Sequence, residues 1–463
     1  MSAVSRPSPE VLRLQQGPIL STLLRLAAPS VAAMVMQVLV GIAETIYIGR
    51  LGTTPLAAMA LVFPFLMLAQ QLSAGAMGGG VSSAVSRALG AADLARANAL
   101  ALHALAIGAL LGAVFTAVML AFGPGFYALL GGKAAVLDQA IGYSSVLFLG
   151  ALLIWLSNTL ASVLRGSGNM RIPSIGILGA SVLQIVLGGL LAFGAGPLPS
   201  LGMTGVAIAN IVANLASVMF FAGYLASGHA RLTLRLRGVS LQREMFFDIL
   251  KVGAVSMISP LQSVLTVLLL TGFIARLGAL PLAGYAIGQR LEFLLIPISF
   301  GIGVAALPMV GMAMGAGNVA RARRVAWTAG FTSACNLALI GFTVAIFPNL
   351  WAALFTPDEA VLVYARQYLQ IAGPAFPLFG LGLTLYFASQ GSGKMLGPVL
   401  AGTARLAVVF GVGTWLVSLP GSTGQFFGLV AASMVVYGLA TAAAVKATRW
   451  GGAGRAAPGA SRR

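Results

Sequence analysis

Residues 49–61 read GRLGTTPLAAMAL and residues 275–287 read ARLGALPLAGYAI, and seven of these 13 positions are identical. Two further pairs of segments match: LGAADLARA at 89–97 with MGAGNVARA at 314–322, and GSGNMRIP at 166–173 with GSGKMLGP at 391–398. The offsets between the partners are 226, 225 and 225 residues, and chance does not keep three matches in register. The chain is therefore a duplication, and the fold is decided by what one copy forms.

The composition indicates that each copy forms membrane-spanning helices. Of the 463 residues, 59% are hydrophobic and only 8% are charged, whereas soluble chains carry about 25% charged residues. A spanning helix needs about 20 mostly apolar residues. Twelve runs meet that requirement: 22–48, 55–85, 97–122, 141–164, 173–195, 202–226, 248–274, 282–313, 325–347, 362–389, 396–418 and 426–446. We therefore expect an all-α membrane protein with twelve transmembrane helices, six in each repeat.

The basic residues orient these helices in the membrane. With a cytoplasmic amino terminus, 22 of the 27 lysines and arginines fall on the inner side, Arg405 among them. The remaining five are Arg50, Lys133, Arg276 and Arg366 on the outer side and Arg290 within the eighth run. Since cytoplasmic loops carry an excess of Lys and Arg, both termini are expected in the cytoplasm. The same orientation accounts for the net charge of +18, so no nucleic-acid partner is expected.

Six helices per copy, an even number, bring both copies into the membrane from the same side. The repeats are then parallel, related by an axis along the membrane normal, and a binding site between them near the midplane follows. The expected segments are a cytoplasmic amino-terminal segment 1–21, a first six-helix lobe 22–226, a basic cytoplasmic linker 227–247, a second six-helix lobe 248–447 and a disordered basic cytoplasmic tail 448–463.

Of the nine acidic residues only Glu44 and Glu292 lie in the interior of apolar runs, because Asp248 is the first residue of its run. A charge at the centre of a membrane costs about 2.5–3.5 kcal/mol, so both carboxyls are candidate functional groups. For Glu44 the alternative is an interfacial position, because Arg50 at the outer edge is about 9 Å of helix away. For Glu292 the alternative is a structural partnership with a basic group. Arg290 points to another face of the helix and either lines a cavity or holds an acid or a helix-end carbonyl.

Five segments in this order and spacing form a further pattern. They are Glu44–Gly52 (ETIYIGRLG), Arg165–Asn169 (RGSGN), Gly205–Asn210 (GVAIAN), Gly288–Glu292 (GQRLE) and Gly311–Gly317 (GMAMGAG). The pattern resembles the MATE (multidrug and toxic compound extrusion) transporter family. The resemblance implies a V of two six-helix lobes that exports drug-like, often cationic organic compounds against H+ or Na+. It also implies small-molecule organic substrates and the lipid bilayer as partners, a monomer in the cell inner membrane, and no cofactor besides the coupling ion.

The resemblance assigns a cation-coupling site to Glu44, Gln184 and Asn210. Family members with a cation site in the amino-terminal lobe carry an Asp on helix 1, and Glu44 occupies that position. On helix 5 such members read Asn-Ile-Val-Leu-Asp-Pro, whereas the stretch from Gln184 reads QIVLGG, so Gly188 replaces their second acid. On helix 6, Asn210 stands where many members have Thr.

The expected substrate cavity is lined by Gln37, Asn158, Asn214, Arg290 and Glu292. Gln37 lies two helical turns before Glu44 on the same helix face. For Asn158, Gln184, Asn210 and Asn214 the alternative role is hydrogen bonding between neighbouring helices. Pro29 frees a backbone carbonyl in helix 1 and permits a kink. We therefore assign Pro29 as the hinge, with bending on protonation of Glu44 as the hypothesis.

The distribution of acids favours H+ over Na+ as the coupling ion. The carboxyl-lobe acids of other family members are absent, because 250–275 and 362–390 contain neither Asp nor Glu. One carboxylate with amide oxygens from Gln184 and Asn210 would hold Na+ only weakly. Low-dielectric surroundings favour the protonated form of a carboxyl, which suits proton uptake and release.

Other classes of membrane protein fit the sequence less well. A lipid or lipid-linked oligosaccharide flippase of the same superfamily is the alternative function, although such proteins often carry more basic residues in the cavity than Arg290. An enzyme would need clustered nucleophile, base or metal groups, and the chain has one cysteine and two histidines. A channel would not need the duplication, and a major-facilitator exporter would show an acidic–basic signature at 89–97. We expect a transporter rather than an enzyme, with no bound metal.

Overall fold

The computed structural model describes residues 9–194, 199–233, 241–419 and 422–451. Within these ranges eleven helical runs are long and apolar enough to cross a membrane, and the bent pair α6 and α7 makes a twelfth. The bounds are α1 Pro9–Gln16, α2 Ile19–Leu51, α3 Thr53–Gln70, η1 Gln71–Met77, α4 Gly78–Gly90, α5 Leu94–Leu129, α6 Ala134–Leu149, α7 Ala151–Gly166, α8 Arg171–Phe193, α9 Met203–Ala226, α10 Arg243–Ser256, α11 Ile258–Ala275, α12 Ala279–Gly315, α13 Val319–Ile346, α14 Asn349–Ala352, α15 Glu359–Ala372, η2 Gly373–Ala375, α16 Phe376–Ser392, α17 Leu396–Val417 and α18 Thr423–Ala447. The expected all-α transmembrane fold is confirmed.

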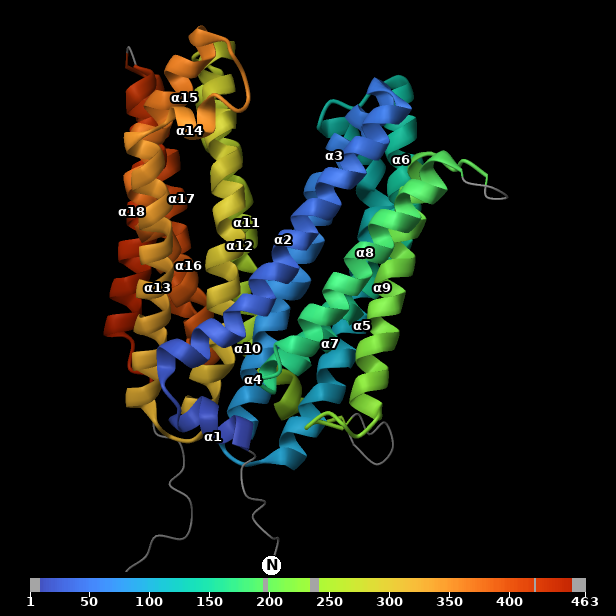
Figure 1. Ribbon diagram of the computed structural model, residues 1–463, viewed down its shortest axis with the longest axis vertical. Coiled ribbons are helices and arrows are strands. Elements are labelled where there is room, and N and C mark those ends of the chain that lie inside the picture. The colour runs from blue at the N-terminus through green and yellow to red at the C-terminus, as the bar shows by residue number, and fades with distance from the viewer. Residues whose placement is uncertain (1–8, 195–198, 234–240, 420–421, 452–463) are drawn as a thin grey trace, which may run out of the picture.

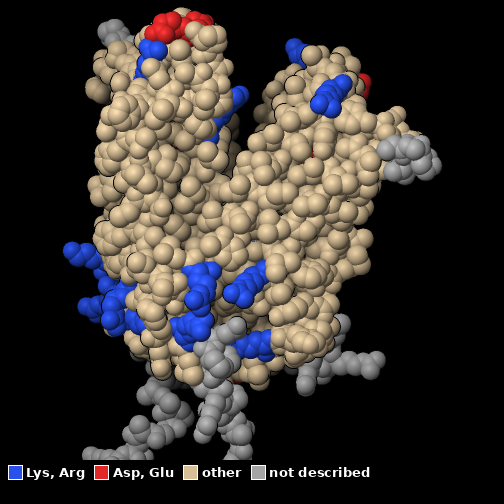
Figure 2. All heavy atoms as spheres, viewed as in Figure 1, with Lys and Arg blue, Asp and Glu red and all other residues tan. Residues whose placement is uncertain are grey.

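The helices form two arms that meet at one end and diverge at the other (Figure 1). The amino-terminal lobe contains α2 to α9, and the carboxy-terminal lobe contains α10 to α18. Helices α1, α4 and α10 lie where the arms meet, which we call the closed end. A cleft separates the arms at the opposite, open end (Figure 2). Helix α2 packs against both α8 and α12, so it contacts both lobes.

The repeated segments 89–97 and 314–322 fold alike at the closed end. The side chain of Asp93 accepts a hydrogen bond from the Arg96 amide, and that of Asn318 accepts one from the Arg321 amide, each at a donor–acceptor distance of 2.9 Å. Asp and Asn are among the best helix N-caps because their side chains satisfy free amides of the first turn. The two caps start α5 and α13, so the duplication is visible at the level of single hydrogen bonds.

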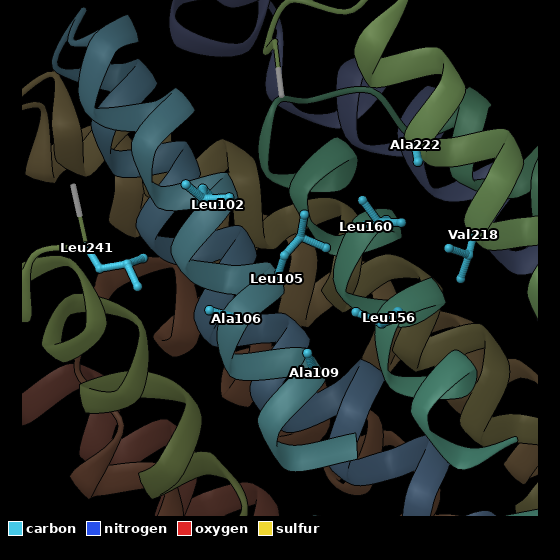
Figure 3. Close-up of a pocket in the computed structure, with 9 residues that line it drawn as sticks. All are labelled: Leu102, Leu105, Ala106, Ala109, Leu156, Leu160, Val218, Ala222 and Leu241. Carbon is cyan, nitrogen blue, oxygen red and sulfur yellow. The ribbon is translucent and has the colours of Figure 1, made fainter. Parts of the chain in front are cut away.

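The amino-terminal lobe carries a groove on the surface of three of its helices. It encloses about 530 Å³ between α5, α7 and α9 and is lined by nine residues, all of them Leu, Ala or Val (Figure 3). Leu241, just before α10, lies at one side of it. This groove is separate from the cleft between the lobes.

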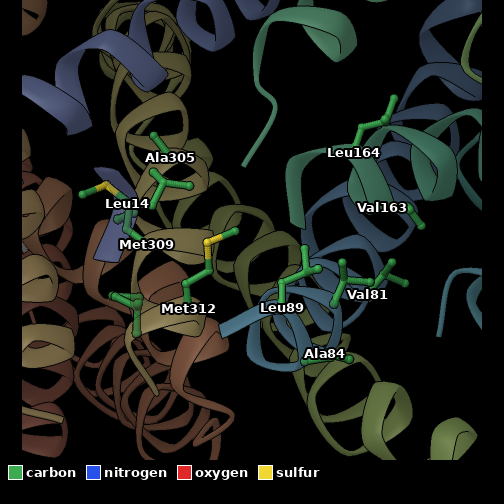
Figure 4. Packing of buried hydrophobic residues seen from close by; sticks show 14 of the residues in the cluster. Leu14, Val81, Ala84, Leu89, Val163, Leu164, Ala305, Met309 and Met312 are labelled. Carbon is green, nitrogen blue, oxygen red and sulfur yellow. The ribbon is translucent and has the colours of Figure 1, made fainter. Parts of the chain in front are cut away.

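A hydrophobic cluster joins the lobes at the closed end. It includes Val81 and Val163 of the amino-terminal half and Ala305, Met309 and Met312 of the carboxy-terminal half (Figure 4). All five side chains are 0% exposed. Packing of apolar side chains is favourable mainly because it removes their surface from water. Between helices surrounded by lipid this driving force is absent, but it operates at the water-facing end of a membrane protein. The cluster therefore keeps this end shut against water.

Helix α4 approaches the carboxy-terminal lobe closely enough for backbone contact. A Cβ atom added to Gly80 would lie 2.7 Å from the backbone nitrogen of Gly253, so only glycine fits there. The helix widens into the π-helix η1 just before α4, and Gln390 of α16 donates its amide to the Gly75 carbonyl within η1 over 2.9 Å. Ser83 of α4 in turn donates to the carbonyl of Gln390. Tight backbone packing and hydrogen bonds thus join the lobes together.

Two arginines of the matched repeat segments cross between the lobes. Arg96, at the start of α5, forms an ion pair with Asp248 on α10. Its repeat counterpart Arg321, at the start of α13, donates to the carbonyls of Leu14, over 3.2 Å, and Gly17, over 2.6 Å. Asp248 lies in the first membrane span of the carboxy-terminal lobe, and Leu14 and Gly17 lie directly before α2. Each arginine therefore binds the segment where the other lobe begins.

The expected segment bounds are only partly within the described residues. Helix α9 ends at Ala226, directly before the expected linker 227–247, and α10 begins at Arg243, so the last five residues of that linker are helical. Arg235 and Arg237 of that linker, residues 1–8 and residues 452–463 lie outside the described residues. The division into lobes, linker and tails by residue number stays a prediction.

Candidate functional site

Glu44 lies inside the amino-terminal lobe, on the side of α2 that packs against α8. Its side chain is 5% exposed, and its Oε1 accepts a hydrogen bond from Gln184 Nε2 over 2.7 Å. The two residues are 140 positions apart in sequence, and helix packing brings them together. The carboxyl is therefore enclosed by neighbouring helices, and its role in cation coupling stays a prediction.

Two tyrosines complete the surroundings of Glu44. Tyr143 of α6 is 4% exposed and lies near enough to Glu44 to interact with it electrostatically. Tyr47, one helical turn after Glu44, donates its hydroxyl to the Ile185 carbonyl over 3.2 Å. Neither tyrosine is among the site residues predicted from the sequence. The signal that identifies Tyr47 is a polar aromatic residue inside an apolar run, one turn from an acid.

Gly188 lies beside this site, where the family resemblance leads one to expect a second acid. A Cβ atom added there would lie 3.7 Å from Ala209 Cβ and 3.8 Å from Tyr47 Cε2, which are ordinary contact distances. The ring of Tyr47 therefore packs over the glycine. The site is built around one carboxyl, one amide and two phenols.

Asn210 and Asn214 of α9 bind each other. Asn214 Nδ2 donates to Asn210 Oδ1 over 3.1 Å and to the Asn210 carbonyl over 2.9 Å. These are the contacts recorded for the two side chains in the described part of the chain, and they do not join Asn210 to Glu44. Asn210 is 5% exposed. A role for Asn210 as a ligand in the coupling site stays a prediction.

Asn158 belongs to a hydrogen-bonded cluster around the π-helix. Its Nδ2 donates to Gln70 Oε1 over 3.0 Å and to Ser73 Oγ over 2.8 Å. Single-turn π-helices inside longer helices frequently mark functional sites. The cluster joins α7 to the point where α3 continues into η1, so Asn158 bonds a neighbouring helix in this conformation.

Gln37 and Pro29 lie on α2 below Glu44. The side chain of Gln37 is exposed, two helical turns before the carboxyl. Pro29 lies within α2, which runs from Ile19 to Leu51 as one helix. Proline removes one intrahelical hydrogen bond, so the helix can bend at this residue at low cost. The hinge role of Pro29 and the lining role of Gln37 stay predictions.

Glu292 of α12 is tied to the interior of the carboxy-terminal lobe. Its carboxylate accepts a hydrogen bond from the hydroxyl of Tyr368 on α15, a side chain that is 0% exposed. Arg290 is exposed instead, and its guanidinium carbon lies 5.2 Å from the centre of the Phe355 ring. The two residues thus face different neighbours, as their spacing predicts.

The prediction that Arg405 lies on the inner side of the membrane, with the loop arginines, is wrong. It lies nine residues into α17 rather than at the inner edge. Its guanidinium carbon is 5.5 Å from the Phe379 ring centre and 5.7 Å from that of Tyr437, and it interacts electrostatically with Glu292. Aromatic faces attract cations, which explains how the membrane interior accommodates this charge. The sequence signal for this interior place is the position of Arg405 within the apolar run 396–418.

A small polar cavity adjoins Arg405 in the carboxy-terminal lobe. It encloses about 20 Å³ between α11, α17 and α18, and Ser259, Gln262 and Thr266 contribute polar side chains. Such a volume has room for one water molecule. At the offset of 226 residues that relates α2 to α11, the repeat counterpart of Gln37 is Ser263, which also lines this cavity.

Comparison with known proteins relates this chain to one family of transporters. The family model described as MatE matches residues 29–190 and 256–416, which covers both repeats. An FAD transporter of Shewanella oneidensis is 25% identical over 376 residues, covering 81% of this chain and 82% of that protein. The multidrug export protein MepA of Staphylococcus aureus is 24% identical over 432 residues, covering 91% and 94%. A solved outward-facing structure of a multidrug resistance MATE family transporter matches with a TM-score of 0.85 and 26% identity, covering 96% of this chain and 100% of that one.

Proposed function

Because the chain belongs to the MatE family, we propose that this multidrug-type transporter exports drug-like, cationic organic compounds in exchange for protons. The family match over both repeats supports transport rather than catalysis. Lys and Arg gather at the closed end (Figure 2), and cytoplasmic loops favour basic residues. We therefore assign the closed end, with both termini, to the cytoplasm of a cell whose inner membrane holds the protein.

The observation that carries the proposal is the buried carboxyl of Glu44, whose hydrogen-bond donor is the uncharged amide of Gln184. An ionised carboxyl at this depth attracts a cation, and protonation removes the attraction. Inward movement of one proton supplies about 2.3 kcal/mol for each 100 mV of membrane potential. The same group can therefore exchange a proton for a cationic substrate.

Alternating access follows from the V of the two lobes. With the closed end in the cytoplasm, the cleft is open to the outside (Figure 2). Opening of the closed end and closure of the cleft would expose the same site to the cytoplasm. Gln37, Asn158, Asn214, Arg290 and Glu292 are the proposed lining residues, Gln184 and Asn210 the proposed partners of Glu44, and Pro29 the proposed hinge.

A second candidate substrate class is anionic aromatic compounds. The relative named as an FAD transporter motivates it, and the exposed guanidinium of Arg290 beside the Phe355 ring offers a matching group. Arginine pairs with phosphate and stacks on aromatic planes. A flavin nucleotide carries both features.

Transport by purified protein in proteoliposomes tests these alternatives. A fluorescent organic cation and FAD are offered separately, each under an imposed pH gradient or an imposed Na+ gradient. We expect the cation to move under the pH gradient in wild-type protein and to move far less in Glu44→Gln. Equal transport by Glu44→Gln under both gradients would refute the coupling assignment, and transport of FAD alone would favour the second candidate.

A further inference from the structure

The groove on the amino-terminal lobe lies at a depth where hydrocarbon surrounds the protein. On α5 its lining residues run from Leu102 to Ala109, about 12 to 22 Å along the helix from its start at the closed end. On α7 and α9 the lining residues Leu160 and Ala222 stand only six and four positions before the helices end at the same side. The groove therefore lies in the membrane leaflet next to the closed end.

One end of the groove is shaped by Leu241, which with Gln242 directly precedes α10. The backbone amide of Gln242 donates to His103 Nε2 over 2.8 Å, while His103 Nδ1 lies 2.7 Å from the Ala99 carbonyl. His103 is 0% exposed, and its ring centre is 4.7 Å from that of Phe246. A neutral imidazole that donates through Nδ1 and accepts through Nε2 explains both contacts. This histidine holds Leu241 against the groove.

Positive charge adjoins that end of the groove. In the described parts of this region, 227–233 and 241–251, the basic residues are Arg231, Arg243 and Lys251 and the acidic ones are Glu244 and Asp248. Arg243 and Lys251 on α10 are exposed, and so is one acid, Glu244. The other acid, Asp248, is already paired with Arg96. Basic residues between helices at the cytoplasmic side attract anionic lipid headgroups, so the charge complements a lipid of that leaflet.

We propose that the groove binds an acyl chain of an anionic phospholipid, whose headgroup lies at Arg243, the first residue of α10. The wall of Leu, Ala and Val side chains accepts hydrocarbon and offers nothing to the polar groups of a drug (Figure 3). His103 belongs to the amino-terminal lobe, while α10 begins the first span of the carboxy-terminal lobe. The bound lipid therefore contacts both lobes at the closed end and stabilises it.

Native mass spectrometry of the purified full-length protein tests the site. The protein is titrated with phosphatidylglycerol and, separately, with phosphatidylcholine of the same acyl chains. We expect wild type to retain phosphatidylglycerol more tightly, and Arg243→Gln to weaken that lipid about fivefold without affecting phosphatidylcholine. Ala106→Phe and, from the facing wall, Ala222→Phe fill the groove and should each abolish tight binding. Ala121→Phe, at an exposed position farther along α5, is the matched control that should retain it.

Three outcomes would overturn the proposal. Equal retention of both lipids by wild type would remove the role of the headgroup. Unchanged binding of phosphatidylglycerol in both filled variants would remove the groove. Displacement of the lipid by the fluorescent cation of the transport assay would make the groove a substrate site. Because lipid retention is measured without a gradient, it stands or falls independently of proton coupling.

Discussion

The two lobes differ most at positions that the duplication makes equivalent. In the amino-terminal lobe Glu44 accepts a hydrogen bond from Gln184 across the contact of α2 with α8. At offsets of 226 and 225 residues the carboxy-terminal lobe has Leu270 on α11 and Val409 on α17. These are 2% and 0% exposed and belong to one hydrophobic cluster. Since the same fold packs with an apolar pair in this place, the carboxyl of Glu44 serves something other than packing.

The carboxy-terminal lobe has its acid, Glu292, at a different position, where a basic residue balances its charge. Glu292 accepts a hydrogen bond from Tyr368 and interacts electrostatically with Arg405. The groups recorded around Glu44 among the described residues, Gln184 and Tyr143, carry no positive charge. Protonation of Glu44 therefore changes the charge of an uncompensated site, whereas Glu292 acts against a fixed cation. This contrast predicts that coupling resides in the amino-terminal lobe.

The largest effect is expected when the acid is moved to the other lobe. Leu270→Glu buries a carboxyl among Phe273, Tyr285 and other apolar groups, and it should lower the free energy of unfolding by about 3 kcal/mol or more. Thermal unfolding of the purified protein measures the loss. Adding Val409→Gln supplies the missing donor and should recover about 1 kcal/mol. Leu270→Met is the volume-matched control; if Leu270→Glu unfolds at the wild-type temperature, the lobes are not energetically different at this place.

A second effect separates the two acids in transport. Glu44→Gln should lower the initial rate of pH-driven cation transport at least about tenfold, equivalent to about 1.4 kcal/mol, because it removes the uncompensated proton site. Glu292→Gln should stay within about threefold of wild type, since it keeps a hydrogen-bond acceptor for Tyr368. Both rates are measured in proteoliposomes at matched protein content. The reverse order would assign coupling to the carboxy-terminal lobe.

The smallest effect compares one pair of glycines. Gly188 and its repeat counterpart Gly413 face equivalent rings, Tyr47 and Phe273, but only at Gly188 does an added Cβ atom find ordinary contact distances. Gly188→Ala should therefore raise the free energy of unfolding by about 0.5–1 kcal/mol, because alanine restricts the unfolded chain. Gly413→Ala should lower it by about 1 kcal/mol through overpacking against Phe273. Equal shifts of the unfolding temperature in both variants would show that the two ring contacts are alike.

The fold could be predicted because its determinants are local and repeated. Apolar runs of membrane length, three matched segments and the uneven placement of arginines define twelve helices in two lobes. The contact of Glu44 with Gln184 was assigned by family resemblance, since no periodicity relates residues on two helices 140 positions apart. Asn210 shows the limit of that reasoning, because its recorded partner is Asn214, one turn away on its own helix.

Arg405 shows a different limit. Basic residues near the ends of apolar runs are interpreted as loop residues because a bare charge is costly in a membrane. The cost falls when aromatic faces and an acid from other helices surround the guanidinium, and the sequence of one helix does not show those neighbours. Tyr368, Phe379 and Tyr437 become relevant only once the helices are packed.

The crossed arginines at the closed end have a consequence for the kinetics of the cycle. Arg96 and Arg321 belong to equivalent places in the two repeats, and each binds the beginning of the opposite lobe. A rigid-body rotation that separates the lobes lengthens both contacts together and exposes the shared hydrophobic cluster in the same movement. An intermediate in which only one of the two arginine contacts is broken is not stabilised by that partial opening. The transition is therefore expected to be cooperative and all-or-none, with a single relaxation rate rather than a succession of partial steps.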